Sequence, residues 1–459
     1  MSGVLSLAAR GRGSFVGGVH PAEDKGLAAD APIEVLPTPV EVRIALLQHL
    51  GAPCESVVKP RAEVQPGDVI GRAEAFVSAP VHASVAGTVV RESVATLPNG
   101  RHVTVIPIRA AEVQPLSGEA LREALFGRAW PLDDVEHYEP AEIAQAARQA
   151  GLVGMGGAAF PTHVKLTRND KKPIDTLLVN GCECEPFLTA DYRMMLEAPL
   201  PLVAGTLLAQ RATGARRAMI CIEDNKPRAI AAMREAAAGL PIEVQVLKTK
   251  YPQGGERQVV VAALGRVVPG GGLPLDVGVV VMNIATTAAL ARAVFRGQPL
   301  THRVVTVSGR GIRTPKNVLA PIGASYGDLI RFCGGVTDQA ARVVAGGPMM
   351  GFTLDAAGEG SELIPTPVTK GTSGITVLDC QDVDRGVETA CIRCGRCVDV
   401  CPMRLVPTRL ALATRAKNRE ILDRYHIASC VECGCCAYAC PARLPLVQLI
   451  RVGKLLARN

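Results

Sequence analysis

The sequence predicts a multidomain protein that combines α/β and α+β folds. Its 459 residues suffice for three or four domains. Hydrophobic residues make up 48% of the chain and charged residues 20%, a composition that excludes disorder. Aromatic residues reach only 3%, so Val, Leu, Ile and Ala must build most of the cores. Along the chain, β-rich, alternating and cysteine-rich patterns follow one another and divide it into five segments.

The first two segments are a lead and a β-rich domain. Residues 1–32 are dominated by Gly, Ala and charged residues, and their first apolar stretch is too short for a secretory signal. From 33 to 111, short apolar runs broken by Gly and Pro predict an all-β domain. Its Gly turns resemble those of the barrel-sandwich (lipoyl-like) fold. The hairpin at 76–84 has no lysine for a carrier group, so a structural or docking role is expected.

Helices and strands mix in the next two segments. Between 112 and 300 they alternate, which is typical of an α/β domain with a largely parallel sheet. The most apolar stretch, 277–295, contains Asn283 and Arg292 and is interpreted as a buried strand followed by a helix. No run of 18 uninterrupted apolar residues occurs, so we expect no membrane span. Residues 301–379 return to short strands around one helix, which predicts an α+β module.

The last segment, 380–459, contains a cysteine pattern that occurs twice. Cys391-x2-Cys394-x2-Cys397-x3-Cys401-Pro is repeated by Cys430-x2-Cys433-x2-Cys436-x3-Cys440-Pro. This is the spacing of two-cluster ferredoxins, in which the fourth cysteine of each run binds the other run's cluster. It predicts one 4Fe–4S cluster on Cys391, Cys394, Cys397 and Cys440, and a second on Cys401, Cys430, Cys433 and Cys436. Two four-cysteine zinc sites are the alternative, which the repeated spacing disfavours.

The other cysteines and the net charge fit the same interpretation. Seven cysteines fall outside the spacing and are expected not to bind metal: Cys54, Cys182, Cys184, Cys221, Cys333, Cys380 and Cys435. From Cys391 onward, twelve Lys and Arg face four Asp and Glu, so this segment carries +8. Two oxidised clusters of about −2 each would offset about half of that charge. The basic surplus therefore does not require nucleic acid, and no nucleic-acid partner is expected.

Two loops of the α/β segment suit a nucleotide. The first, GLVGMGGAAFPTHVK (151–165), has glycines that allow a phosphate to approach and a lysine at its end. A tight structural turn explains these glycines equally well, because their spacing is not the dinucleotide fingerprint. The second, NGCECEP (180–186), places Glu183 and Glu185 just past a predicted strand, where α/β sheets bind ligands. These acids could accept from ribose hydroxyls or be merely solvated, and they point the same way only if the segment is extended.

Together with YPQGGER (251–257) and MNIATT (282–287), these loops resemble the FMN- and NADH-binding subunit of respiratory complex I. The resemblance implies a Rossmann-like domain in which the Gly-rich loop holds the flavin phosphate and the acids contact flavin and nicotinamide nucleotide. Two residues depart from that family's pattern, since Cys182 stands in place of Asp and Phe187 in place of Gly. Carried over residue by residue, the resemblance implicates Gly154, Gly156, Gly157, Lys165, Asn180, Glu183, Glu185, Asn283 and Thr286.

Further motifs accompany the flavin loops and the dicluster ending along the chain: GGVHPAEDK (17–25), RVVTVSG (303–309), GGPMMG (346–351) and PVTKGTSGI (367–375). In this order the pieces, which extend over nearly the whole chain, are similar to the C subunits of bacterial Rnf electron-transport complexes. The resemblance implies a β-grasp (SLBB-like) module at 301–379. It also implies a peripheral subunit on the cytoplasmic face of the bacterial inner membrane, which passes electrons between NAD(H) and ferredoxin through FMN and two 4Fe–4S clusters. Its partners would be NADH, ferredoxin and the integral and peripheral Rnf subunits, through which it would contact the membrane.

Two other functions use the same modules. A soluble NADH-dependent diaphorase, such as a cobalamin reductase, would turn over its acceptor without membrane partners. A docking subunit that has lost nucleotide binding would carry about eight iron atoms and retain no flavin. No catalytic residue is assigned, because the eight scattered histidines form no hydrolytic arrangement with Ser, Cys or Asp.

Overall fold

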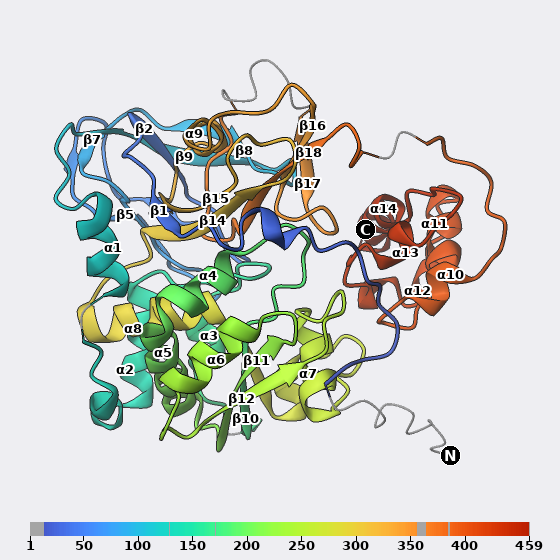
Figure 1. Ribbon diagram of the computed structural model, residues 1–459, viewed down its shortest axis with the longest axis horizontal. Helices are drawn as coiled ribbons and strands as arrows, with labels where there is room; N and C mark the ends of the chain where they lie inside the picture. The colour runs from blue at the N-terminus through green and yellow to red at the C-terminus, as the bar shows by residue number, and fades with distance from the viewer. Residues whose placement is uncertain (1–12, 128, 170, 356–363, 384–385, 459) are drawn as a thin grey trace.

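The computed structural model describes residues 13–127, 129–169, 171–355, 364–383 and 386–458. Residues 1–12, which include the apolar stretch of the expected lead, lie outside this range. Figure 1 shows a β-rich upper half, an α/β lower half and a helical C-terminal domain to one side. The lead runs along the C-terminal domain between these parts, with one short 3-10 helix at Lys25–Leu27. The predicted fold class, multidomain α/β and α+β, is confirmed.

Two small antiparallel sheets form the barrel-sandwich domain. One has the order β2 (Glu41–Ala45), β9 (His102–Ala110), β7 (Gly87–Val89) and β4 (Glu63–Val64), with β8 (Ser93–Thr96) also on β9. The other has the order β3 (Glu55–Ser56), β5 (Val69–Arg72) and β6 (Val81–His82). β-branched residues from both sheets, among them Val42, Ile70 and Ile106, are completely buried between them. Aliphatic side chains thus build this core, as the low aromatic content predicts.

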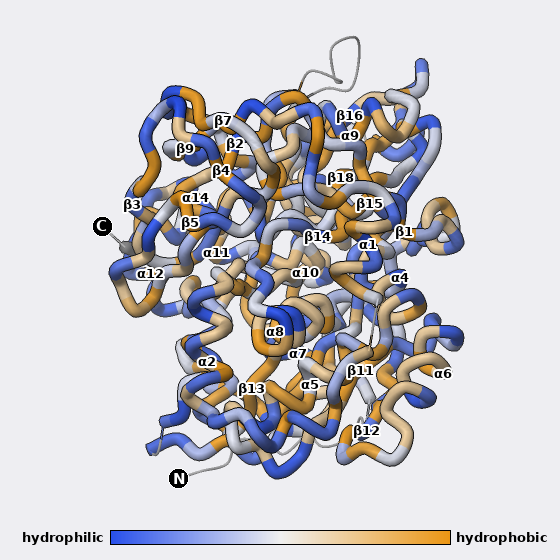
Figure 2. The backbone as a smooth tube through the Cα atoms, turned by 90° about the vertical axis from the view of Figure 1, so that its left-hand side faces the viewer, coloured by the Kyte–Doolittle hydropathy of each residue, from blue (hydrophilic) through white to orange (hydrophobic). Residues whose placement is uncertain are grey.

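A four-stranded parallel sheet is the centre of the α/β domain, in the order β12 (Ile242–Leu247), β11 (Arg217–Glu223), β10 (Thr176–Asn180) and β13 (Val279–Asn283). One face carries the helices α2 (Pro140–Gln149), α4 (Ala190–Glu197), α5 (Pro199–Thr213), α6 (Pro227–Ala236) and α8 (Ile284–Arg296). The other face packs on α7 (Glu256–Leu264). Successive residues of β10 are buried toward opposite faces, which explains its unbroken apolar run. In Figure 2 the apolar colouring accordingly runs through β13, α5 and α8.

The remaining elements of this domain lie around its core. They are α1 (Gly118–Phe126), α3 (Thr162–Leu166) and two 3-10 helices at Leu132–His137 and Pro274–Val277. Helices α5 and α8 cross closely, and Gly205 is required there because a Cβ would overlap the carbonyl oxygen of Thr287.

The β-grasp module is one mixed sheet in the order β1 (Ile33–Val35), β15 (Lys316–Pro321), β14 (His302–Ser308), β18 (Gly374–Asp379), β16 (Ala340–Ala345) and β17 (Phe352–Asp355). Its helix α9 (Tyr326–Phe332) begins with a capping box between Ser325 and Asp328. Strand β1 differs from the sequence-based expectation. It falls within the range assigned to the barrel-sandwich, yet it pairs in parallel with β15. The edge strand of the module therefore comes from the N-terminal part of the chain, far from residues 301–379 in the sequence.

Short helices and turns form the C-terminal domain: α10 (Arg396–Asp399), α11 (Pro407–Arg415), α12 (Arg419–Arg424), α13 (Cys435–Tyr438), α14 (Leu446–Arg458) and a 3-10 turn at Ile427–Ser429. The two cysteine runs repeat the same backbone conformation. Gly395 and Gly434, each just before a short helix, both adopt positive φ, as do Arg404 and Arg443 after the fourth cysteines. No helix in the described part of the chain combines the length and apolarity needed to cross a bilayer.

Candidate functional site

The expected flavin residues gather at the carboxyl ends of β10 and β13. These strands are neighbours in the sheet, and their last residues, Asn180 and Asn283, are register partners. The chain builds outward from β10 through β11 to β12 and then returns to place β13 on the other side of β10. This reversal is the topological switch point at which open α/β sheets bind ligands.

The Gly-rich loop is attached to the start of α8. Asn283 caps that helix, because its Oδ1 accepts from the N–H groups of Ala285 and Thr286. The Thr286 hydroxyl accepts in turn from the Met155 N–H at 3.0 Å. A Cβ on Gly156 would lie 2.5 Å from Nδ2 of Asn283, so only glycine fits there. The loop thus runs past a helix N-terminus, which is favourable for a phosphate.

Gly157 differs from Gly156 because the folded chain does not need it to be glycine. An added Cβ there would meet no atom within 4 Å. Gly154 is similarly unconstrained, its nearest contact being the Phe160 carbonyl oxygen at 3.7 Å. The open side of the loop is therefore free for a ligand that approaches the backbone closely.

The polar residues around the loop are already engaged with one another. Lys165 donates to Oε1 of Glu256 at 2.6 Å and to the Val281 carbonyl. Asn180 donates to the Gly254 carbonyl of the YPQGGER turn at 2.8 Å. These contacts hold the side chains in place around the switch point, and Lys165 brings a charge that Glu256 balances.

The two acids of the NGCECEP loop point to different parts of the molecule. Glu183 accepts from the N–H groups of Asp191 and Tyr192 and so caps α4. Glu185 accepts instead from the N–H groups of Met349 and Met350 in the β-grasp module. The acids diverge because the chain bends at Glu185 and is not extended. Burial raises the pKa of Glu185 to about 7.

Tyr251 connects this loop to the cysteine domain. Its hydroxyl donates to the carbonyl of Cys433 at 2.7 Å and lies 3.4 Å from Oε1 of Glu185. The ring is 2% exposed and packs with Val19 of the lead and with Cys435. At the same junction, Gly434 is required because its Cβ would lie 2.5 Å from the Met349 carbonyl oxygen. Four segments therefore meet where the flavin loops approach the cysteine runs.

Gln253 is a residue that sequence reasoning missed. It is completely buried in the YPQGGER turn, and neither Nε2 nor Oε1 of its amide has a hydrogen-bond partner among the described residues. Such a group is costly unless a ligand or water satisfies it. A flavin ring presents N–H and C=O groups at its edge, so the residues present fit FMN. The turn was visible in the sequence, but only burial distinguishes the amide from an ordinary turn residue.

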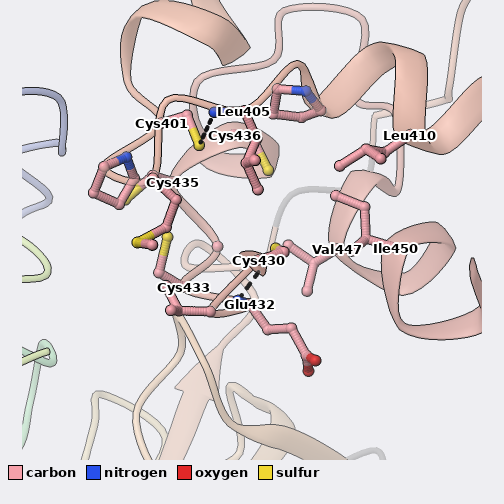
Figure 3. A pocket seen from close by; sticks show the side chains of 15 residues that line it. Cys401, Leu405, Leu410, Cys430, Glu432, Cys433, Cys435, Cys436, Val447 and Ile450 are labelled. Carbon is pink, nitrogen blue, oxygen red and sulfur yellow. Dashed lines mark hydrogen bonds between the residues drawn. The ribbon is translucent and has the colours of Figure 1, made fainter. Parts of the chain in front are cut away.

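Four of the predicted cluster ligands surround one pocket. Cys401, Cys430, Cys433 and Cys436 line this cavity (Figure 3). Leu410, Val447 and Ile450 form its apolar wall. The Leu405 N–H donates to the sulfur of Cys401 and the Glu432 N–H to that of Cys430, at 3.3 and 3.4 Å. Such bonds, with an apolar wall, are the means by which proteins tune iron–sulfur clusters. The fold thus brings Cys401 to the second run, as the crossed spacing predicts.

The other four cysteines differ in exposure. Cys397 is buried in an apolar cluster with Ala411, Leu446 and Cys436, and Cys440 packs against it, while Cys394 is exposed and Cys391 half-exposed. Among the described residues, no three His, Cys, Asp or Glu side chains converge as a single-ion site requires.

Cys435 lines the same cavity, and its thiol lies against the sulfur of Cys433 (Figure 3). It is completely buried, and its sulfur lies 3.9 Å from the Tyr251 carbonyl oxygen. Of the two adjacent cysteines, Cys436 is a predicted cluster ligand, whereas Cys435 is a buried residue outside the ligand spacing.

Comparisons with known proteins agree with the succession of modules. Four family models match: the RnfC barrel sandwich hybrid domain at residues 13–112, the Nuo51 FMN-binding domain at 147–292, the SLBB domain at 304–353 and the 4Fe-4S dicluster domain at 390–444.

Three curated proteins are similar over most of their length, and each is the C subunit of an ion-translocating complex. The chain is 44% identical to that of the proton-translocating ferredoxin:NAD(+) oxidoreductase complex of Clostridium ljungdahlii, covering 95% of this chain and 93% of that protein. It is 38% identical to the Na(+)-translocating counterpart of Acetobacterium woodii, covering 87% of each. It is 39% identical to the counterpart in the ion-translocating oxidoreductase complex of Rhodobacter capsulatus, covering 89% of this chain and 76% of that protein.

Proposed function

Because the chain belongs to the family of C subunits of ion-translocating ferredoxin:NAD(+) oxidoreductase (Rnf) complexes, we propose that it carries electrons between NADH and the rest of such a complex through its switch-point site and its cysteine domain. It is an oxidoreductase subunit with an FMN-binding domain and a 4Fe–4S dicluster domain. Its partners are the other Rnf subunits, ferredoxin and NADH. We place it on the cytoplasmic face of the inner membrane, where NADH is available.

The contact of Tyr251 with Cys433 carries the proposal. It joins the flavin loop to the loop that holds three of the four cysteines around the cavity. Electron transfer needs its centres close together, and this hydrogen bond fixes the cysteine domain against the switch point. In this arrangement Cys401, Cys430, Cys433 and Cys436 would hold one cluster beside the contact with Tyr251, and Cys391, Cys394, Cys397 and Cys440 would hold the other.

The residues at the switch point would bind and orient the flavin. Gly154, Gly156 and Gly157 would let the backbone approach its phosphate, beside the start of α8. Bound FMN would supply the conversion of a two-electron hydride donor into single electrons. Asn180, Asn283 and Thr286 hold the loops in register, while Glu183 stabilises α4 and Glu185 holds the β-grasp loop against the site. The buried amide of Gln253 would bind a polar edge of the ring.

The test is a cofactor inventory with matched variants. The chain is purified anaerobically, its iron, sulfide and FMN are quantified, and its response to NADH is followed by EPR. We expect about eight iron atoms, one FMN and cluster signals that appear with NADH. Cys436→Ser should lose about half of the iron, whereas Cys435→Ser, one residue away, should lose none. Zinc in place of iron, or equal iron loss in both variants, would contradict the assignment.

The same inventory separates the other two functions. Iron without FMN and without a response to NADH would identify a docking subunit. Turnover of cobalamin by the isolated chain, without co-purification of integral partners, would identify a soluble reductase.

A further inference from the structure

Two buried cations of the β-grasp module contact carbonyl groups of the Gly-rich loop. Lys370 is completely buried, and its Nζ donates to the carbonyls of Pro80 at 2.6 Å and Gly151 at 2.7 Å. Arg303 is 3% exposed, and both of its terminal nitrogens lie 3.4 Å from the Met155 carbonyl oxygen. The Arg303 guanidinium also donates to the Lys370 carbonyl, so the two cations form one unit.

The unit contacts the loop at several points. Gly151 opens the loop at positive φ, and a Cβ on it would lie 2.6 Å from Nζ of Lys370, so glycine is required. Gly371, the next residue after Lys370, approaches Ala159 near the end of the loop. The Met155 carbonyl faces Arg303, and because the peptide is trans the N–H of Gly156 must point away from the guanidinium. The loop is therefore polarised, with the Gly151 and Met155 carbonyls toward the cations and the Gly156 N–H directed away from Arg303.

No acid among the described residues faces Lys370. The titratable groups that do face it are His49, His82 and Cys54. None of them is anionic at neutral pH, since burial lowers the pKa of His82 to about 3 and raises that of the Cys54 thiol. By contrast, Lys226 is also buried but has a counter-ion, because its Nζ lies 2.7 Å from Oε2 of Glu223.

The ammonium of Lys370 is therefore costly to charge without a counter-ion. Burial lowers its pKa to about 7, so at neutral pH it is charged in only part of the molecules. A buried charge without a partner favours an incoming anion, which would in turn hold the ammonium in its charged form.

Among the described residues, Arg303 has one carboxyl group within electrostatic reach. This group is Asp191, whose carboxyl accepts a hydrogen bond from the Asn283 side chain. Burial and the neighbouring Glu183 raise the pKa of Asp191 to about 7. Asp191 therefore supplies only part of a negative charge at neutral pH. A phosphate monoester, which carries about −1.5 to −2, would complete the balance.

We propose that Lys370 and Arg303 make the site selective for a phosphorylated flavin by supplying buried positive charge behind the loop that receives the phosphate. This rests on the proposed function, in that the loop must bind FMN. The charge acts only on the phosphate, so it should distinguish FMN from riboflavin, which has the same ring and no phosphate.

The test is a titration of the flavin-depleted full chain with FMN and with riboflavin, followed by flavin fluorescence. Lys370→Gln and Arg303→Gln should each weaken FMN binding by about tenfold or more and change riboflavin binding by less than about threefold. Arg292→Gln is the matched control. It removes another buried cation, which lies over the ring of Phe126 in the α/β domain, and should leave the ratio of the two affinities unchanged.

The outcomes separate the two proposals. A wild-type chain that binds neither flavin overturns the proposed function. A wild-type chain that binds FMN while the glutamine variants lose both flavins equally, or lose neither, overturns the charge-based selectivity. If the glutamine variants do not fold, the charge-preserving variants Lys370→Arg and Arg303→Lys decide. They must keep the wild-type preference for FMN, and its loss there also overturns the inference.

Discussion

Replacing Tyr251 by phenylalanine removes one hydroxyl from the junction between the flavin loop and the cysteine domain. The ring is 2% exposed and should keep its packing, so the change is confined to two polar contacts. The lost contacts are the 2.7 Å hydrogen bond to the Cys433 carbonyl and the 3.4 Å approach to Glu185.

The expected cost follows from burial. An ordinary intramolecular hydrogen bond contributes about 0.5–1.5 kcal/mol net, whereas removing one partner and leaving a buried carbonyl unsatisfied costs about 1–3 kcal/mol in total. We expect docking of the cysteine domain to weaken by about 1.4–2.8 kcal/mol, which raises the undocked population about ten- to a hundredfold. Amide hydrogen exchange in residues 430–436 should accelerate accordingly.

Electron transfer gives the second readout. NADH-driven bleaching of the clusters, followed by anaerobic stopped-flow absorbance, should slow in Tyr251→Phe, whereas bleaching by dithionite should not change. Tyr138→Phe is the control, because Tyr138 packs on Phe295 at the far end of α8. Unchanged hydrogen exchange together with unchanged NADH-driven bleaching would refute the role given to this contact.

Three further predictions concern the clusters, the loop and the pH dependence. Cys401→Ser should abolish the same EPR signal as Cys430→Ser, because both line one cavity, and loss of different signals would rule out crossed ligation. Gly156→Ala should lower both the melting temperature of the flavin-free chain and FMN affinity, whereas Gly157→Ala, which has open space around its Cβ, should lower only FMN affinity, by about tenfold. Burial raises the pKa of the Glu185 carboxyl to about 7 from its ordinary value of 4.5. Between pH 4.5 and 7 the folded chain therefore keeps a proton on Glu185 that the unfolded chain has lost. Stability should therefore fall as pH rises from 4.5 to 7, and Glu185→Gln should flatten this slope in melting temperature. An unaltered slope would contradict the burial of a neutral acid.

The sequence predicted what depends on spacing along the chain. The cysteine runs placed Cys401 with the second run because ligation in such domains follows a fixed pattern, and the fold brings these residues to one cavity. Likewise the apolar stretch 277–295 predicted a buried strand followed by a helix, and it forms β13 and α8.

Contacts between modules could not be predicted in the same way. Glu183 and Glu185 are two residues apart, yet one caps α4 and the other binds the loop at Met349. Which contact each makes depends on a bend and on a module more than 150 residues away. The unpaired amide of Gln253 and the unbalanced charge of Lys370 are equally invisible in a sequence, because both depend on burial.

The pairing of β1 with β15 has a consequence for synthesis of the chain. Ile33 pairs with Asn317, about 280 residues later. At about 5–20 residues per second, a ribosome needs roughly 15–60 s to reach that partner. During this interval the barrel-sandwich domain, which lies between the two strands in the sequence, can fold, while the backbone of β1 remains unpaired. Its length of three residues then protects the nascent chain, because so few N–H and C=O groups cannot pair stably with a neighbouring ribosome's product.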